Sequence, residues 1–180
     1  MESVVSVKRS ILTFFGAKAD VRETDSDTIR RIAADLDRLD PDRARYVAGF
    51  AFVLNRVAHA DDRVSDDEVA TMERLVREKG HLPPEQAVLV VQMARSHQAL
   101  FGATDDFLVT RELGRVASYE DKVALIDCLF AVAAADGRIL VVEANEIAGI
   151  ARELRVEQPE LSRLRSSYRE FLAVREGLGG

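Results

Sequence analysis

One stretch of the chain occurs twice, at a fixed offset of 75 residues. Residues 54–68 read LNRVAHADDRVSDDE, and residues 129–143 read LFAVAAADGRILVVE. The matching positions include two carboxylates and an arginine in each copy, at Asp61 and Asp136, Arg63 and Arg138, and Glu68 and Glu143. A match that keeps one register across a helix and the following loop indicates duplication of a structural unit. We therefore predict that the chain folds as two related halves.

Apolar residues recur at helical spacing through almost the whole chain, and Gly, Pro and capping residues interrupt the pattern at regular intervals. No segment shows the alternation or the β-branched density of a strand. The sequence predicts an all-α fold. The expected helices cover residues 25–39, 41–60, 65–79, 85–97, 104–115, 119–135, 141–154 and 159–175.

The most apolar of these segments, residues 41–60 and 119–135, each precede one copy of the acidic turn. Either half alone would leave its apolar helix partly uncovered. We predict a single helical domain over residues 24–176, built from repeats at about 25–98 and 104–176 that a pseudo-two-fold axis relates. An N-terminal helix and connector at residues 1–23 are expected to precede it.

The duplicated turns are the candidate site. Asp61, Glu68, Asp136 and Glu143 are oxygen ligands in tight loops, which suit a hard divalent cation such as Ca²⁺ or Mg²⁺. The first turn adds Asp62, Asp66 and Asp67. The second turn has Gly137 and, one helical turn past Glu143, Glu146, but Leu140, Val141 and Val142 replace the polar residues of the first copy.

The same carboxylates have a second interpretation. Aspartates in turns accept hydrogen bonds from their own backbone, and a glutamate three residues after a cap favours a helix start. Ser65 and Glu68 have the spacing of a capping box. The spacing of an EF-hand loop is absent.

Composition limits the partners and the chemistry. A net charge of −6 argues against nucleic acid or an anionic membrane unless basic residues are concentrated in a patch. The chain has one cysteine, no secretory leader and no uncharged apolar stretch long enough to span a bilayer, so a cytoplasmic location is expected. No phosphate-binding glycine loop, serine elbow or Cys/His cluster is present, and we predict that the chain is not an enzyme.

A short apolar stripe at residues 4–15 lies beside Lys8 and Arg9. Three interpretations stay open for it: packing on the domain, contact with a second copy in a homodimer, and association with a membrane surface.

Two copies of an Ala-Asp-Gly/Asp-Arg-Val/Ile pattern, each followed by Glu, resemble the TerB tellurite-resistance family and the related N-terminal domain of DjlA-type co-chaperones. The resemblance covers roughly residues 25–175. It implies an all-helical domain with an acidic, metal-binding surface and a role in stress response or membrane-associated complexes, and it implies no catalytic reaction. The His-Pro-Asp signature of a J-domain is absent.

We therefore predict a non-catalytic binding module that presents its acidic turns to a divalent cation or to a protein partner in a tellurite-type stress response. The alternatives are a metal-dependent enzyme that uses the acidic turns and a structural or oligomerisation domain.

Overall fold

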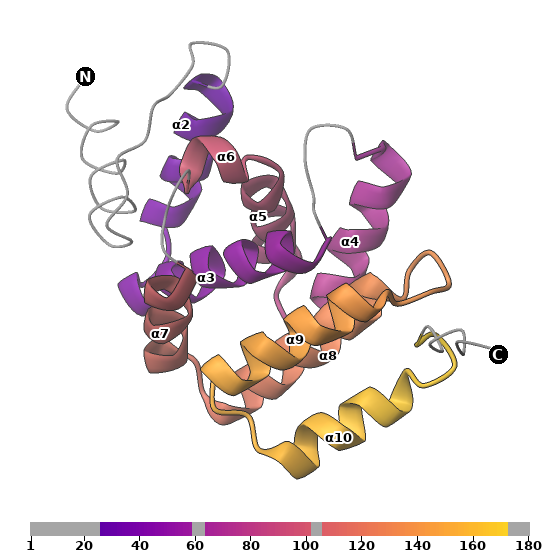
Figure 1. Ribbon diagram of the computed structural model, residues 1–180. Coiled ribbons are helices and arrows are strands. Elements are labelled where there is room, and N and C mark those ends of the chain that lie inside the picture. Colours follow the sequence, from indigo (N-terminus) through magenta and orange to yellow (C-terminus); the bar gives the residue numbers. More distant parts are fainter. Residues whose placement is uncertain (1–25, 59–63, 102–105, 173–180) are drawn as a thin grey trace, which may run out of the picture.

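The computed structural model describes residues 26–58, 64–101 and 106–172. Every regular element in these ranges is a helix (Figure 1). In chain order the helices are α2 (Ser26–Asp37), α3 (Pro41–Ala58), α4 (Asp66–Glu78), α5 (Pro84–Arg95), the short α6 (His97–Leu100), α7 (Asp106–Val116), α8 (Tyr119–Ala133), α9 (Val141–Glu153) and α10 (Gln158–Ser167). The all-α prediction is confirmed.

Helix α3 is the centre of the first half. It is buried nearly all round from Tyr46 to Leu54 and again at Val57, as its apolar sequence predicts. Helices α5 and α7 pack on it, and α8 and α9 of the second half pack on it as well. Figure 1 shows α5 above α3, α8 and α9 below it, and α7 across its left-hand end.

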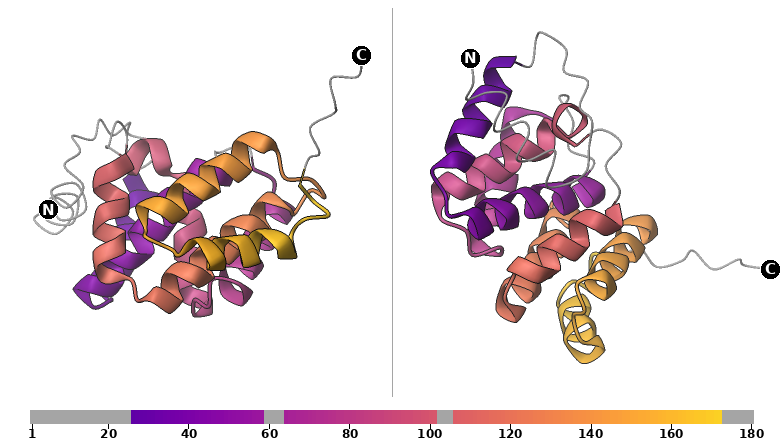
Figure 2. Two further views of the ribbon diagram at one scale, coloured as in Figure 1. Left: turned by 60° about the horizontal axis from the view of Figure 1, so that its bottom comes forward. Right: turned by 90° about the vertical axis from the view of Figure 1, so that its left-hand side faces the viewer.

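Helix α8 has the same role in the second half. Its residues are buried from Ala124 to Ile126 and from Cys128 to Ala133, and α9 and α10 cover it. The two views of Figure 2 show α8, α9 and α10 as one group of helices beside α3. The two apolar helices thus form one continuous core.

The helix bounds follow the 75-residue offset closely. Helix α4 spans Asp66–Glu78 and α9 spans Val141–Glu153, and the packing of α3 on α9 has its counterpart in the packing of α4 on α8. The halves also differ, because α9 packs on the helix that precedes it, whereas α4 packs chiefly on α5 and α8. The pseudo-two-fold relation stays a prediction.

Two predicted helices end early. The segment predicted at 85–97 ends at Arg95 and is followed by a separate short helix. The last helix ends at Ser167 instead of near 175, because Tyr168 turns inward, stacks on Phe130 at 5.5 Å and donates a hydrogen bond from its hydroxyl to Asp127 Oδ1 at 2.7 Å. The chain then runs back to the second turn, where Ile139 N donates to the Phe171 carbonyl at 2.7 Å.

Two further predictions concern the ends of the chain and its surface. The helix and connector predicted at residues 1–23, with the stripe at 4–15, lie outside the described residues. In the described part of the chain, no helix has both the length and the hydropathy that a membrane span requires.

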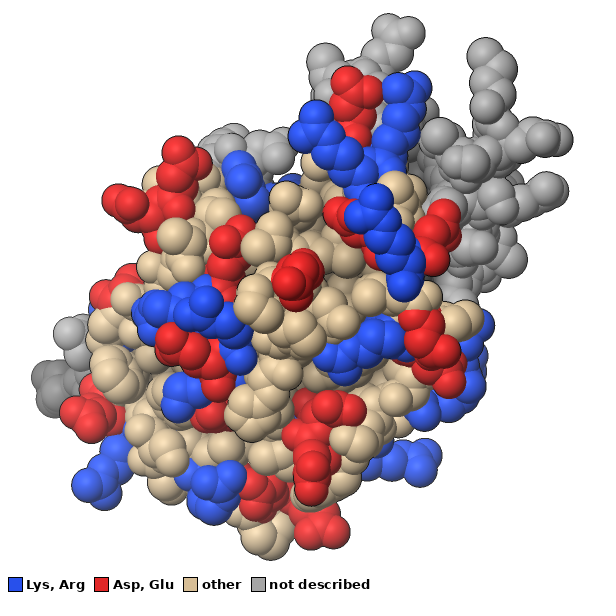
Figure 3. All heavy atoms as spheres, turned by 180° about the vertical axis from the view of Figure 1, so that it is seen from behind, with Lys and Arg blue, Asp and Glu red and all other residues tan. Residues whose placement is uncertain are grey.

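On the face opposite that of Figure 1, acidic and basic side chains are interspersed (Figure 3).

Candidate functional site

The first acidic turn is described only from Val64 onward, so Asp61 and Asp62 lie outside the described residues. At its end the predicted capping box is present. Ser65 Oγ accepts from Glu68 N at 3.3 Å, and Glu68 Oε2 accepts from Ser65 N at 2.8 Å and from Ser65 Oγ at 2.7 Å. These bonds from the hydroxyl and the amide of Ser65 lower the pKa of Glu68, which is therefore ionised at neutral pH.

The second turn is described completely. Asp136 Oδ1 accepts from Arg138 N at 3.2 Å, and Gly137 adopts a φ of +93°, which suits a residue without a Cβ. Glu143 Oε2 accepts from Leu140 N at 2.7 Å, at the start of α9. Leu140 offers no side-chain acceptor in return, so only half of a capping box forms here. Both carboxylates bond to the backbone of their own turn, as the second interpretation expects.

Within residues 26–58, 64–101 and 106–172, no group of three or more His, Cys, Asp and Glu side chains is placed to hold a metal ion. Asp61 is outside these ranges, so the metal-ligand assignment of Asp61, Glu68, Asp136 and Glu143 stays a prediction. Glu146, which the sequence offers as a further ligand of the second turn, is instead paired with an arginine of the first half.

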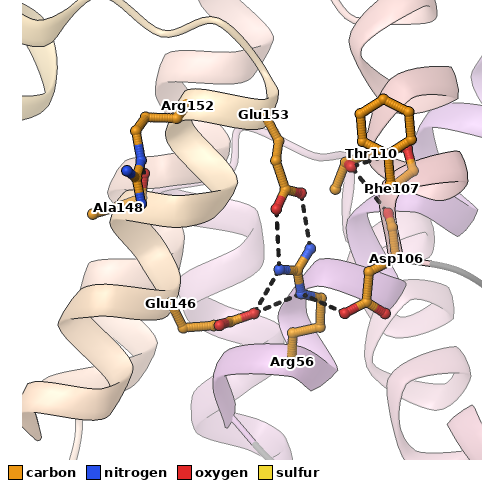
Figure 4. Close-up of polar contacts among 8 residues, drawn as sticks. All are labelled: Arg56, Asp106, Phe107, Thr110, Glu146, Ala148, Arg152 and Glu153. Atoms are coloured by element: carbon orange, nitrogen blue, oxygen red, sulfur yellow. Dashed lines mark hydrogen bonds and ion pairs between the residues drawn. The ribbon is translucent and has the colours of Figure 1, made fainter.

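That arginine is Arg56, near the end of α3. Its Nε donates to Glu146 Oε1 at 2.7 Å, its Nη1 donates to Glu153 Oε2 at 3.1 Å, and its Nε lies 3.6 Å from Asp106 Oδ2 (Figure 4). The side chain is only 12% exposed. Burial alone would lower the pKa of Arg56, but the hydrogen bonds to Glu153 and Glu146 outweigh it and raise the pKa.

We call Arg56, Asp106, Glu146 and Glu153 the Arg56 cluster. It joins α3 to α7 and α9, so it links the two halves of the domain. Sequence reasoning missed it because the position 75 residues after Arg56 is Ala131, and the repeat therefore gives no signal there. Its partners Asp106, Glu146 and Glu153 are 50, 90 and 97 residues away in the chain, and no local pattern indicates such pairs.

Three consecutive apolar side chains are exposed where the second turn enters α9. Leu140 is 44% exposed, Val141 49% and Val142 64%. The first turn has Ser65, Asp66 and Asp67 at the corresponding positions. We call residues 140–142 the apolar triplet.

A family model described as tellurite resistance protein TerB matches residues 48–166, a segment that contains both turns and extends from within α3 to within α10. The chain belongs to the TerB family. No curated protein and no solved structure gave a significant match to it. The family model confirms the TerB resemblance that the duplicated turns carry.

A groove of about 890 Å³ on this TerB domain lies between the end of α4, α8 and α10. One of its lining carboxylates, Asp127, accepts a hydrogen bond from Tyr168 on one oxygen, and its other oxygen lies 3.7 Å from Lys79 Nζ. Burial and the bond to Asp127 raise the pKa of Tyr168, and burial raises the pKa of the neighbouring Cys128 thiol. Both groups are therefore protonated at neutral pH and poorly suited to act as nucleophiles.

Proposed function

We propose that this chain is a non-catalytic TerB-type binding module that holds a protein partner of a tellurite-type stress response against its second helix-turn-helix. The observation that carries the proposal is the apolar triplet, Leu140 to Val142, exposed beside Asp136 and Glu143.

The triplet is unfavourable for the isolated domain on two counts. The exposed parts of these leucine and valine side chains gain no free energy from burial, which is worth roughly 25 cal/mol for each Å² removed from water. Val141 and Val142 also occupy the first turn of α9, where the helix dipole favours acidic residues such as those that begin α4. A partner that covers the triplet would remove both penalties, and the charged residues around it would form a polar rim.

The test uses the duplication itself. The double variant Val141→Asp with Val142→Asp copies the start of α4 into α9, so its thermal stability should equal or exceed that of the wild type. A photo-crosslinking amino acid at Leu140 should capture a defined protein in the wild-type background, and the double variant should lose both this product and tellurite resistance in the host.

A matched control adds the same charge elsewhere. Gln158→Asp with Ser162→Asp also introduces two carboxylates at exposed positions, on α10, and should leave crosslinking and resistance unchanged. Full resistance in the Val141/Val142 double variant, with an unchanged crosslinked product, would refute the proposed contact.

A divalent cation at the first turn is a second proposal. Asp66, Asp67 and the ionised Glu68 are all exposed at the start of α4, and the predicted ligand Asp61 precedes Asp66 by five residues in the sequence. Titration calorimetry with Ca²⁺, Mg²⁺, Mn²⁺ and Zn²⁺ should show binding that Asp61→Asn removes and Asp136→Asn leaves intact, since the second turn has Val141 and Val142 in place of two aspartates. Equal heats from wild type and Asp61→Asn would contradict it.

A further inference from the structure

A second cleft, of about 500 Å³, lies between α7, the first turns of α8 and the end of α9. One face of α7 forms a wall through Phe107, Thr110, Arg111, Gly114 and Arg115. The remaining lining comes from Lys122 of α8 and from residues 152–155. Five of the residues along it are basic, on a chain whose net charge is −6. The cleft is of a size that holds small molecules.

The charges of this cleft are only partly neutralised by the protein. Glu153 is the one carboxylate among the described lining residues, and it is already bonded to Arg56 at 3.1 and 3.4 Å. Arg115 pairs with Glu112 at 3.1 Å. Arg111, Lys122 and Arg155 have no acidic partner among the residues that the structure describes.

Arg152 also lines the cleft, but its guanidinium bonds to the Ala148 carbonyl of its own helix and does not join the Arg56 cluster (Figure 4). Arg111, Lys122 and Arg155, the three cations without an acidic partner among the described residues, come from α7, from α8 and from just past the end of α9.

The backbone at Arg155 is unusual. Arg155 has a φ of +60°, in the left-handed region, and ends α9 with Val156 N bonded to the Ala151 carbonyl at 2.8 Å. Glycine is the favoured residue at this position of a helix end. Gly80, 75 positions earlier, has no positive φ, and at the end of α4 it is His81 that adopts a left-handed φ of +56°. An arginine held in a conformation that favours glycine points to a use for its side chain.

Gly114, in the wall of the cleft, also indicates that the cleft has a use. Glycine within a helix is less stable than alanine, and a Cβ built at Gly114 would meet only Leu154 Cδ2, at an ordinary distance of 3.8 Å. Packing does not require a glycine here, but its absence of a side chain keeps this part of the wall open.

We propose that this cleft binds a phosphate group that carries at least two negative charges, held by Arg111, Lys122 and Arg155. Guanidinium groups bind phosphate oxygens in pairs, and lysine adds a point charge. The phosphate can belong to a soluble small molecule or to a lipid headgroup. The cleft is at the opposite end of α9 from the apolar triplet, roughly 18 Å along the helix, so this proposal is independent of the proposed protein contact.

The test is calorimetric titration of the full chain with pyrophosphate at low ionic strength, and flotation with phosphatidylcholine vesicles that do or do not contain phosphatidylinositol 4-phosphate. Arg155→Gly should weaken binding about tenfold, as the loss of one charge-assisted hydrogen bond predicts, and should leave thermal stability unchanged or raise it. Arg111→Gln should weaken binding similarly. The affinity should fall as NaCl is added.

Arg165→Gln is the matched control, because it removes one positive charge from an exposed position on α10 outside the cleft. It should bind like the wild type. Pyrophosphate binding with this pattern identifies a soluble ligand, and binding only to the phosphoinositide vesicles with the same pattern identifies a headgroup. The proposal is overturned if neither probe binds more tightly than about 10 mM, or if Arg165→Gln weakens binding as much as Arg155→Gly.

Discussion

Replacing Arg56 by methionine should destabilise the domain more than removal of any surface ion pair would. Methionine keeps an apolar stem in the space that the buried arginine fills, but it leaves Glu146 and Glu153 close together without a counter-charge. Removing one partner of a fully buried ion pair costs about 3–5 kcal/mol. Here the side chains of Glu146 and Glu153 are 37% and 30% exposed, so water screens part of the remaining charge. We expect a loss of about 2 kcal/mol.

The measurement is thermal unfolding at pH 7 followed by circular dichroism. For a chain of this length, 2 kcal/mol corresponds to a fall in Tm of about 4–8 °C. The control is Arg74→Met, because Arg74 pairs with Glu78 on the surface of α4 and both side chains are about half exposed. Such a pair contributes less than about 0.5 kcal/mol.

A third variant separates charge repulsion from lost packing. Adding Glu146→Gln and Glu153→Gln to Arg56→Met removes the two charges left without a partner, and should restore at least about 1 kcal/mol. The reasoning is refuted if Arg56→Met lowers the Tm no more than Arg74→Met does. Strict additivity in the combined variant would show that repulsion between the carboxylates is not the cause.

Three further predictions concern local features. Ser65→Ala should raise the pKa of Glu68, as an NMR titration would show. Because the pKa of Glu68 is lowered in the fold, its carboxylate contributes stability at pH values above its unfolded pKa of 4.5, and this contribution is lost as the pH falls through the folded pKa. Burial lowers the pKa of His97, whose Nδ1 has no hydrogen-bond partner among the described residues, so stability should decline as the pH falls below about 6.5. The decline should be smaller in His97→Phe, and denaturation midpoints at pH 7.5 and 5.5 would show the difference. Gly80→Ala should destabilise the domain by more than about 1 kcal/mol, because the new Cβ would lie 2.5 Å from the Val76 carbonyl oxygen. Gly149→Ala, whose Cβ would have nothing within 4 Å, should instead stabilise α9 by about 0.5–1 kcal/mol. Chemical denaturation of both variants distinguishes a steric effect from one of helix propensity.

Much of the fold was predictable because its signals are local. The capping box at Ser65 and Glu68 depends on groups three residues apart, and the structure contains it. The apolar sequences of α3 and α8 identify them as buried helices, which they are. The end of α10 was predicted wrongly, because Tyr168 leaves the helix for contacts with Phe130 and Asp127, which are about 40 residues away.

The candidate site was predictable only in part. The repeat located the two turns, and the backbone bonds of Asp136 and Glu143 follow from turn chemistry that a sequence can indicate. The exposed apolar triplet and the basic cleft have no such local sequence signal. The exposure of Val141 and Val142 depends on what the surrounding helices leave uncovered, and the basic cleft needs Arg111, Lys122 and Arg155 brought together from three elements.

The sequence by itself determined that this chain is helical, that it carries one turn motif twice, and where the helices of those turns begin. Helix periodicity and capping arise from interactions within about four residues of the chain, so a sequence can indicate them. The tertiary structure decided the rest. It pairs Arg56 with Glu146 and Glu153 across the two halves, and it encloses a basic cleft on an acidic chain. The physical reason is that helix periodicity fixes which face of a helix is apolar but not which other helix covers it, so contacts between residues 90 or more apart exist only once the helices have packed.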